Sequence, residues 1–283
     1  MATEGLYAEY FGLSERPFTL LPDPDLVFWS PQHRLAMTVL EYGLLSRAPI
    51  TLVSGEIGAG KTTMLQSILR KIEADMTVGL ISNARGGRGE LLQWILNAFD
   101  VDTKGLQDNY VARFQRFQDF LLAEYAAGRR CVLFVDEAQN LSAEGLEELR
   151  MLTNINAGKD ELIQLVLVGQ PELRDIVRSP QMRQLAQRIS ASIHLDRLSV
   201  DQTRKYVAYR LKAVGGTGKE IDPSAAPLIQ ERTGGIPRLI NQLCDLAMLY
   251  AWGAEHPRVT ERDFLAVLND GMFFGDVTAG SAE

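Results

Sequence analysis

The segment Gly55-Glu56-Ile57-Gly58-Ala59-Gly60-Lys61-Thr62 constrains this chain more than any other. It matches the pattern G-x-x-x-x-G-K-[ST] and lies between an apolar run at 50–54 and an apparent helix that begins at residue 61. Glycine lets the backbone turn tightly around phosphate oxygens, where a Cβ would clash. The successive N–H groups and the start of the helix then attract an anion. The pattern therefore predicts a phosphate-binding loop between a buried strand and a helix.

The roles of single residues in this loop follow from the same chemistry. We expect the Lys61 ammonium to contact the β- and γ-phosphates of a nucleotide, and the Thr62 hydroxyl to bind Mg²⁺. The predicted nucleotide-binding residues of the loop are Gly55, Glu56, Ile57, Gly58, Ala59, Gly60, Lys61, Thr62 and Thr63. The alternative, a Gly-rich turn with an exposed lysine, does not explain the strand and helix on either side.

The overall composition is that of an ordinary globular protein. The 283 residues are 46% hydrophobic and 23% charged, and allow one large domain or two modest ones. No apolar run approaches the ~20 residues of a membrane span, and the N-terminus lacks the features of a signal peptide. We therefore expect a cytoplasmic location. Cys131 and Cys244 have no C-x-x-C partner or nearby histidines, so both are predicted to be buried and reduced.

The charge balance argues against a general nucleic-acid binder. The net charge is −7, and residues 199–283 carry 9 Lys/Arg against 11 Asp/Glu. Non-specific DNA binding draws most of its free energy from Lys and Arg that neutralise phosphates. An acidic chain is therefore a poor default DNA binder, although a local basic patch, or one formed only in an oligomer, stays open.

Short apolar runs alternate with helical patterns from residue 50 onward. The expected strands are 50–54, 77–82, 131–135, 163–168 and 191–195, and the expected helices are 33–45, 61–74, 90–98, 108–127, 143–156 and 172–178. This alternation predicts an α/β fold with a parallel five-stranded sheet sandwiched by helices. After residue 200 only helices are expected, at 201–214, 223–232, 236–253 and 260–270.

Four parts of the chain follow from this pattern. Residues 1–48 form a Pro- and aromatic-rich segment and a first helix, expected to pack on the α/β core. Residues 49–198 form the nucleotide-binding domain, residues 199–272 a small all-helical lid domain, and residues 273–283 a flexible tail.

Two carboxylates follow the apolar strand Cys131-Val132-Leu133-Phe134-Val135. Ligands bind at the carboxyl ends of parallel strands, so Asp136 is placed to hold Mg²⁺ through water, and Glu137 to orient and deprotonate an attacking water. An acidic turn after a core strand is the alternative. Gln170 follows the next apolar strand and is expected beside Asp136, where its amide could bind the γ-phosphate or the water. Its alternative role is to cap the helix that follows.

Three arginines are candidates for contacts with a nucleotide. Arg183 and Arg188 precede the last strand, and arginines there can stabilise the transition state of phosphoryl transfer, also from a neighbouring subunit. Arg238 lies in the first turn of a helix, where a cation is unfavourable unless an anion compensates it. We predict nucleotide binding by Arg238 and a catalytic role for Arg188. A surface charge is the alternative for each.

These motifs together resemble the AAA+ ATPases, and more closely the ExeA-type (general secretion pathway A-like) family. The resemblance covers residues 7–270. It rests on Tyr10–Leu13, Arg16–Phe18, Pro22–Pro24, Ser30–Arg34, Gly55–Thr62, Asp136–Gln139, Leu149–Asn154, Val168–Leu173, Gln187–Ile189 and Gly235–Arg238.

The resemblance implies a role for each matching position. Lys61 and Thr62 match the Walker A pair, and Asp136 and Glu137 match Walker B. Gln170 lies at the sensor 1 position, Arg188 matches an arginine finger that acts on the next subunit's nucleotide, and Arg238 matches sensor 2 in the lid. The stretch 22–33 matches a segment that packs near the adenine. The family thereby implies ATP, Mg²⁺, and a ring, partial ring or filament of identical subunits.

The family includes more than one biological role. Type II secretion members continue after the ATPase into a transmembrane segment and a periplasmic peptidoglycan-binding module, whereas this chain ends at Glu283. An excised ATPase domain and a free-standing relative, such as those of exopolysaccharide export and pilus assembly, both stay open. The leading expectation is a cytoplasmic switch or assembly motor for the cell envelope. A peripheral place at the inner membrane, through a protein partner, is compatible with it.

Two other functions are weighed against this one. A DNA-binding regulator of the transposition type, which forms filaments on DNA, would use the basic loop 83–88, where Arg85 and Arg88 could follow a phosphate backbone. A solvated surface loop is the favoured explanation of these residues. A nucleotide-gated scaffold without hydrolysis is disfavoured because Glu137 and Arg188 are both present.

Overall fold

The computed structural model describes residues 7–20, 26–72, 75–82, 89–105 and 109–277. The chain divides into two compact units. The first contains Met1–His33, Glu56–Met64 and Asp196–Glu283, and the second contains Arg34–Gly55 and Leu65–Leu195. The basic loop 83–88, the Pro22–Pro24 motif and the end of the tail lie outside the described residues.

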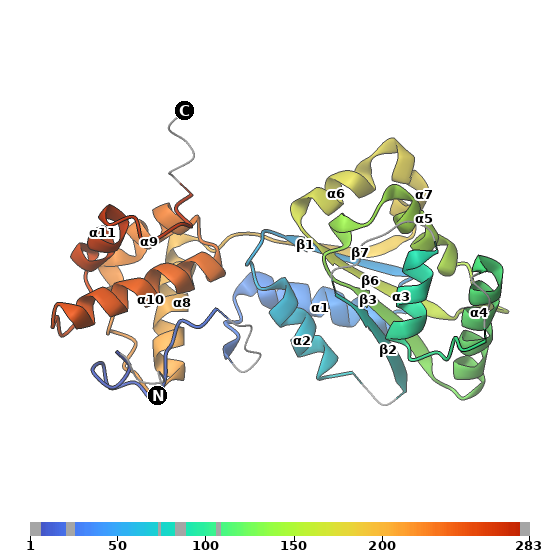
Figure 1. The fold of residues 1–283 in the computed structure, drawn as a ribbon, viewed down its shortest axis with the longest axis horizontal. Helices are drawn as coiled ribbons and strands as arrows, with labels where there is room; N and C mark the ends of the chain where they lie inside the picture. Colours follow the sequence, from blue (N-terminus) through green and yellow to red (C-terminus); the bar gives the residue numbers. More distant parts are fainter. Residues whose placement is uncertain (1–6, 21–25, 73–74, 83–88, 106–108, 278–283) are drawn as a thin grey trace. The chain divides into compact units, whose positions relative to one another are not determined.

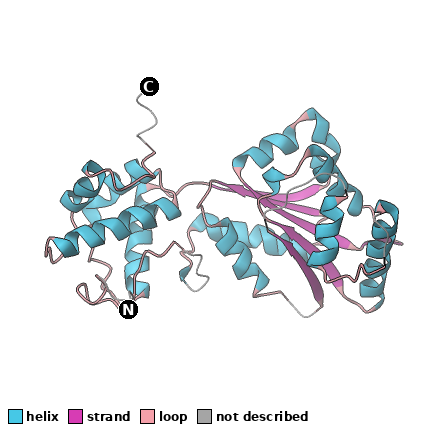
Figure 2. Cartoon of the chain, in the orientation of Figure 1, coloured by secondary structure: helices cyan, strands magenta, loops and turns pink. Residues whose placement is uncertain are grey.

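The second unit is built on a parallel five-stranded sheet, as the sequence predicts (Figures 1 and 2). Its strands are β1 (Ile50–Gly55), β2 (Met76–Ile81), β3 (Arg130–Val135), β6 (Ile163–Gly169) and β7 (Ile189–Leu195). Their order across the sheet is β2-β3-β6-β1-β7. The helix α1 (Pro31–Leu45) precedes the first strand. The helices between the strands are α2 (Lys61–Leu69), α3 (Glu90–Ala98), α4 (Tyr110–Ala126), α5 (Ala143–Leu152), α6 (Pro171–Arg178) and α7 (Arg183–Ala186).

Burial explains why the central strands are apolar along their whole length. Every residue of β1 and β6 is buried, so both faces of the sheet are covered there. Alternate residues such as Leu52, Leu133 and Leu165 join one core cluster with residues of the helices α3 to α6. Cys131 belongs to this cluster and is a free, buried cysteine, as predicted.

The strand register brings three functional segments to one edge of the sheet. Val135 is paired with Leu167, and Ser54 with Gly169, all in parallel strands. The carboxyl ends of β1, β3 and β6 therefore lie at the same edge. The phosphate loop leaves β1 from this edge, directly after Gly55.

Two predicted helices are too long. The helix expected over 61–74 ends at Leu69. The helix expected over 143–156 ends at Leu152, and a short antiparallel hairpin follows, with β4 (Asn156–Ala157) paired to β5 (Asp160–Glu161). Gly158 in the hairpin loop has φ +65°, a conformation that glycine adopts without strain. The reversal takes the chain away from the helix axis, so the helical pattern of the sequence overruns by one turn.

Between residue 199 and residue 277, where the structure describes the chain, the first unit contains four α-helices, again as predicted: α8 (Val200–Ala213), α9 (Ala226–Thr233), α10 (Pro237–Gly253) and α11 (Glu261–Asn269). A capping box at Ser199 starts α8. The helices share a core that includes Leu211, Ile240 and Phe264, and the predicted buried cysteine Cys244.

The N-terminal segment differs from the expectation that it packs on the α/β core. Tyr7, Leu13 and Phe18 are buried in the core of the helical bundle. Asp245 of α10 accepts hydrogen bonds from the Tyr7 hydroxyl and the Arg16 guanidinium, which anchors the segment there. Its aromatic side chains thus belong to the core of the helical bundle. From Arg34 onward, α1 belongs to the sheet-containing unit.

Candidate nucleotide-binding site

The phosphate loop has the backbone that its glycines predict. Gly58 and Gly60 have φ of +79° and +97°, values that residues other than glycine rarely adopt. A Cβ on Gly58 would lie 2.6 Å from the Cβ of Arg238, and one on Gly60 would lie 3.1 Å from His33 Nε2. Glycine therefore suits each position for two reasons: the backbone conformation, and the close approach of a neighbouring side chain.

Lys61 is the first residue of α2 and is folded back over the loop. Its side chain is only 5% exposed, and its ammonium donates to the Glu56 carbonyl at 2.9 Å. A buried ammonium is costly unless polar groups compensate it, so this lysine is held by the loop that it serves. The carboxylate of Glu56 points elsewhere and pairs with Arg197 at 2.8 Å.

Arg238 belongs to the same compact unit as the loop. It lies in the first turn of α10, and its backbone N–H donates to the Gly58 carbonyl at 3.3 Å. Its side chain is exposed. Because the loop and the start of α10 are in direct contact, an anion in the loop would lie within reach of two positive helix ends, those of α2 and α10.

The two predicted carboxylates belong to the sheet-containing unit. Asp136 is buried directly after β3, and its Oδ1 accepts the backbone N–H of Glu137 at 2.9 Å. Glu137 has φ +54°, an uncommon conformation for a residue with a side chain. Such strain is found at functional sites more often than elsewhere.

Two amide side chains hold the Glu137 carboxylate. Its Oε2 accepts hydrogen bonds from Gln139 Nε2 at 2.5 Å and from Gln170 Nε2 at 3.1 Å. The Oε1 of Gln139 in turn accepts the backbone N–H of Gln170 at 2.9 Å. A Cβ on Gly169 would lie 2.7 Å from Gln139 Oε1, so the glycine makes room for this amide. The sequence placed Gln170 at this edge but gave no role to Gln139, which appeared only as the last residue of the matching motif Asp136–Gln139.

Arg188 lies between α7 and β7 and is bound within its own chain. Its guanidinium pairs with Glu161 of the hairpin at 3.1 Å, and it donates to the Thr153 carbonyl at 3.3 Å and to the Asn154 side chain. Arg183 stands at the start of α7 with an exposed side chain. The structure thus separates the two candidate arginines, one fastened to the hairpin and one at the surface.

The donor set agrees with a hard cation. The Thr62 hydroxyl in the first turn of α2 and the Asp136 carboxylate are oxygen ligands, which Mg²⁺ prefers. In the described part of the chain no three His, Cys, Asp or Glu side chains form a preformed metal cluster. Such a cation would therefore rely on phosphate oxygens and water for its other ligands.

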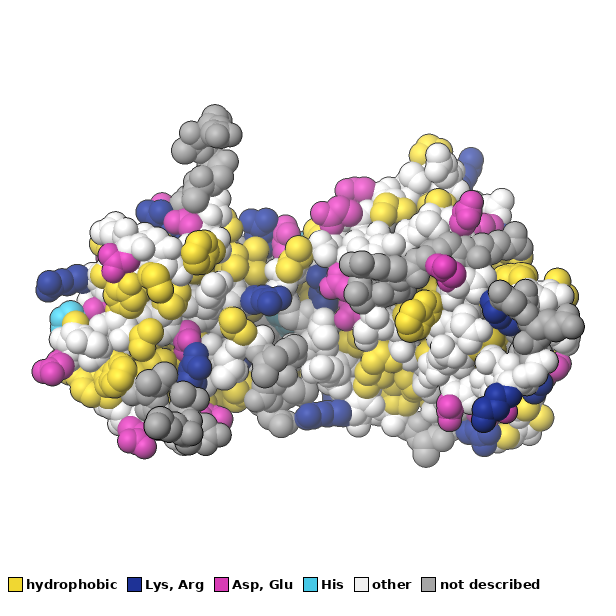
Figure 3. Space-filling model, in the orientation of Figure 1, with side chains coloured by type: hydrophobic (Ala, Val, Ile, Leu, Met, Phe, Trp, Pro, Cys, Tyr) yellow, Lys and Arg dark blue, Asp and Glu magenta, His cyan; other side chains and the backbone are white. Residues whose placement is uncertain are grey.

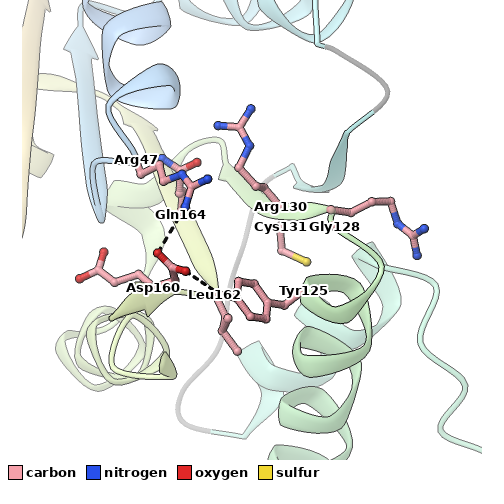
Figure 4. A pocket seen from close by; sticks show the side chains of 10 residues that line it. Arg47, Tyr125, Gly128, Arg130, Cys131, Asp160, Leu162 and Gln164 are labelled. Carbon is pink, nitrogen blue, oxygen red and sulfur yellow. Dashed lines mark hydrogen bonds and ion pairs between the residues drawn. The ribbon is translucent and has the colours of Figure 1, made fainter. Parts of the chain in front are cut away.

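A separate pocket of about 340 Å³ lies at the opposite edge of the sheet, where β3 and β6 begin (Figure 4). Arg47 and the Tyr125 hydroxyl both reach Asp160, at 3.4 and 2.6 Å. The other two arginines that line the pocket are also paired, Arg129 with Glu124 and Arg130 with Asp75. These charges already compensate one another, so the pocket shows no surplus charge for a ligand.

Comparison with known proteins identifies the class. A family model described as an AAA domain matches residues 44–177. The fold resembles the ORC1 protein of Aeropyrum pernix solved in complex with DNA, with 20% identity, a TM-score of 0.63, and coverage of 90% of this chain and 69% of that one. It also resembles RuvB, a Holliday junction branch migration motor of Thermotoga maritima, with 19% identity, a TM-score of 0.53, and coverage of 85% and 69%. These likenesses show the fold alone, that of the AAA+ P-loop proteins.

A curated protein is more similar in sequence. General secretion pathway protein A of Aeromonas hydrophila is 38% identical over 261 residues, which are 91% of this chain and 47% of that protein. This match and the AAA domain match confirm the predicted resemblance to the ExeA-type AAA+ proteins. It spans about half the length of this relative. Among the residues that the structure describes, no helix is long and apolar enough to cross a membrane.

Proposed function

We propose that this chain binds ATP with Mg²⁺ and hydrolyses it at subunit interfaces, as a switch or assembly motor in cell-envelope assembly. The observation that carries the proposal is the phosphate loop at the end of β1, with a strained glutamate at the end of β3, two strands away in the same sheet. Because both strands end at one edge, the loop and Glu137 can act on one nucleotide.

Binding uses the loop, Lys61 and the start of α10. The loop N–H groups and the Lys61 ammonium bind the phosphates, and Arg238 adds a positive charge from the helical unit. Thr62 and Asp136 would hold Mg²⁺, which would supply positive charge to neutralise the phosphates. Because Arg238 N–H already contacts the loop at Gly58, nucleotide binding and the position of α10 are expected to be linked.

In hydrolysis, Glu137 acts as the general base. Its carboxylate orients a water molecule, whose oxygen attacks the γ-phosphorus while its proton passes to the carboxylate. The bond between the γ-phosphorus and the bridging oxygen breaks, and ADP leaves. Gln139 and Gln170 fix the carboxylate through Oε2 and so set its direction. Arg188, once released from Glu161, would stabilise the transition state in the neighbouring subunit.

The envelope role rests on the relative and on the charge. The similar protein of Aeromonas hydrophila carries the name general secretion pathway protein A. The chain is acidic, and on the face shown in Figure 3 the Lys and Arg side chains lie scattered among acidic ones. Both observations favour a protein partner of the cell envelope, and a peripheral place at the inner membrane through it, over a filament on DNA.

The deciding experiment measures ATP hydrolysis against protein concentration, with and without double-stranded DNA at low salt, and the mass of the particle with and without ATP. The proposal predicts activity that rises more steeply than concentration, a larger particle with ATP, and no response to DNA. Activity strictly proportional to concentration would argue against interface sites. Strong stimulation by DNA would favour the transposition-type regulator instead.

A further inference from the structure

His33 is a buried histidine with both ring nitrogens engaged. It is the third residue of α1 and only 6% exposed. Its Nδ1 lies 2.7 Å from Ser30 Oγ, and its Nε2 lies 3.0 Å from the carbonyl oxygen of Ala59 in the phosphate loop. All three residues belong to one compact unit.

The partners determine which nitrogen carries the proton. A carbonyl oxygen can only accept, so Nε2 must be the donor to Ala59. In a neutral ring Nδ1 then accepts, and it does so from the Ser30 hydroxyl. Burial lowers the pKa of His33, which keeps the ring neutral, and the hydrogen bond to Ala59 opposes this only in part.

Ser30 fixes both the ring and the backbone of His33. The hydroxyl oxygen of Ser30 also accepts the backbone N–H of His33 at 3.2 Å, in the manner of a residue that caps a helix. Ser30 itself is fully buried. The imidazole therefore cannot turn away from the loop without breaking hydrogen bonds in a buried place, which is costly.

The Ala59 carbonyl matters because of what lies across the same peptide plane. In a trans peptide the C=O and the following N–H point in opposite directions. With the Ala59 oxygen held towards His33, the Gly60 N–H points the other way. Glycine at 60 makes this peptide easy to rotate, since φ +97° and many other conformations are open to it. A loop that binds phosphate through N–H groups needs this rotation to be restricted.

We propose that His33 is a positioning residue of the phosphate loop: it holds the Ala59–Gly60 peptide so that the Gly60 N–H faces the phosphates of a bound nucleotide. This inference rests on the proposed nucleotide binding. His33 acts through the loop and does not itself contact the phosphates. The imidazole also lies against Gly60, where a Cβ would be 3.1 Å from Nε2, so ring and glycine are matched in size.

Two amide substitutions separate this role from a purely structural one. In His33→Gln the amide nitrogen can occupy the place of Nε2 and donate to Ala59. In His33→Asn the side chain is shorter, and its nitrogen corresponds to Nδ1 and cannot reach. The dissociation constant of a fluorescent ADP analogue is measured for both, with thermal unfolding as a check of the fold.

We expect His33→Asn to bind ADP about fivefold to tenfold more weakly than the unchanged protein, as the loss of one buried hydrogen bond would produce, and His33→Gln to stay within about twofold. Ser30→Ala keeps the ring but removes its partner, and should weaken binding by about two- to threefold. If His33→Asn does not fold, the pair His33→Gln and Ser30→Ala still gives the ordering.

Equal affinities in all four proteins would overturn the inference, as would equal losses in His33→Gln and His33→Asn. A folded, unchanged protein that binds no adenine nucleotide would instead refute the proposed function. The two failures are thus distinct, because the first requires nucleotide binding in the unchanged protein and the second excludes it.

Discussion

The phosphate-loop side and the carboxylate side of the candidate site are held in different ways. Main-chain oxygens of the loop accept hydrogen bonds from the groups around it. Glu56 accepts from Lys61 Nζ, Gly58 from the Arg238 N–H, and Ala59 from His33 Nε2. Glu137 is held instead by the side-chain amides of Gln139 and Gln170. The first arrangement fixes a backbone, and the second fixes one carboxylate.

This difference suggests a division of labour. A backbone whose carbonyls are tied outward keeps its N–H groups inward, so the binding side is prepared before the nucleotide arrives. Amide side chains can exchange one acceptor for another at little cost, so the position of Glu137 can respond to what binds nearby. We therefore expect changes on the loop side to alter affinity, and changes on the carboxylate side to alter turnover.

The largest effect is expected from Arg188→Ala, which removes the proposed finger. Hydrolysis should fall by about 10³-fold or more, with nucleotide affinity nearly unchanged. Because the finger acts on a neighbour, mixing Arg188→Ala with Lys61→Ala should restore part of the activity, since the second variant supplies fingers to sites of the first. Arg183→Ala is the matched control and should retain activity.

Two results would break this assignment. If the mixture stays inactive although both variants assemble with the unchanged protein, Arg188 does not act between subunits. If Arg188→Ala weakens nucleotide binding as much as Lys61→Ala does, its role lies on the binding side of the comparison.

Glu137→Gln tests the carboxylate side directly. The amide has nearly the same shape but cannot take a proton from water, so hydrolysis should fall by about 10²- to 10⁴-fold while ATP still binds. The ATP-bound oligomer should persist, which size-exclusion chromatography with ATP can follow. A variant that hydrolyses ATP at the normal rate would show that another group is the base.

Lys61→Ala tests the loop side. Loss of a buried, charge-assisted contact should weaken ATP binding by roughly 10- to 100-fold, measured by titration with a fluorescent nucleotide. Lys61→Arg keeps the charge but not the compact ammonium, and serves as the control for charge alone. Unchanged affinity in Lys61→Ala would show that this lysine of the loop does not contribute to nucleotide binding.

Gln139→Ala sharpens the comparison, because it loosens Glu137 without removing it. We expect hydrolysis to slow by about three- to tenfold at unchanged affinity, since one hydrogen bond to a charged group is lost. Gln170→Ala loses only the longer bond, of 3.1 Å, and should slow hydrolysis less. An equal or larger loss of affinity in either variant would contradict the division between the two sides.

The sequence predicts the frame of this site better than its contacts. The strand and helix patterns and the loop motif predict the parallel sheet and the edge at which Asp136 and Gln170 lie. These features can be predicted because they depend on local periodicity in the sequence. The hairpin β4–β5 escapes, since strands of two residues show no alternation. The partners of Arg188 depend on that hairpin and could not be foreseen. His33 was linked only with the adenine side, by resemblance, whereas the structure puts its ring on the loop.

The smallest expected effect concerns the pH dependence of stability. Burial lowers the pKa of His33 from its ordinary value of 6.5 in the folded chain. Below pH 6.5 the unfolded chain therefore binds a proton at His33 that the folded chain does not, so acidification stabilises the unfolded state. The free energy of unfolding should fall as the pH drops from 6.5 toward the lowered folded pKa, by up to about 1.4 kcal/mol for each pH unit.

His33→Gln removes this one contribution and keeps all the others. Urea unfolding of the unchanged protein and of His33→Gln at pH 7.5, 6.0 and 5.0 should give curves that converge as the pH falls, because only the unchanged protein loses the His33 contribution. Parallel curves would mean that the ring takes up a proton equally well in both states. The loop would then be held by an imidazole open to protonation, and the binding side would no longer differ from the carboxylate side in being fixed before the nucleotide arrives.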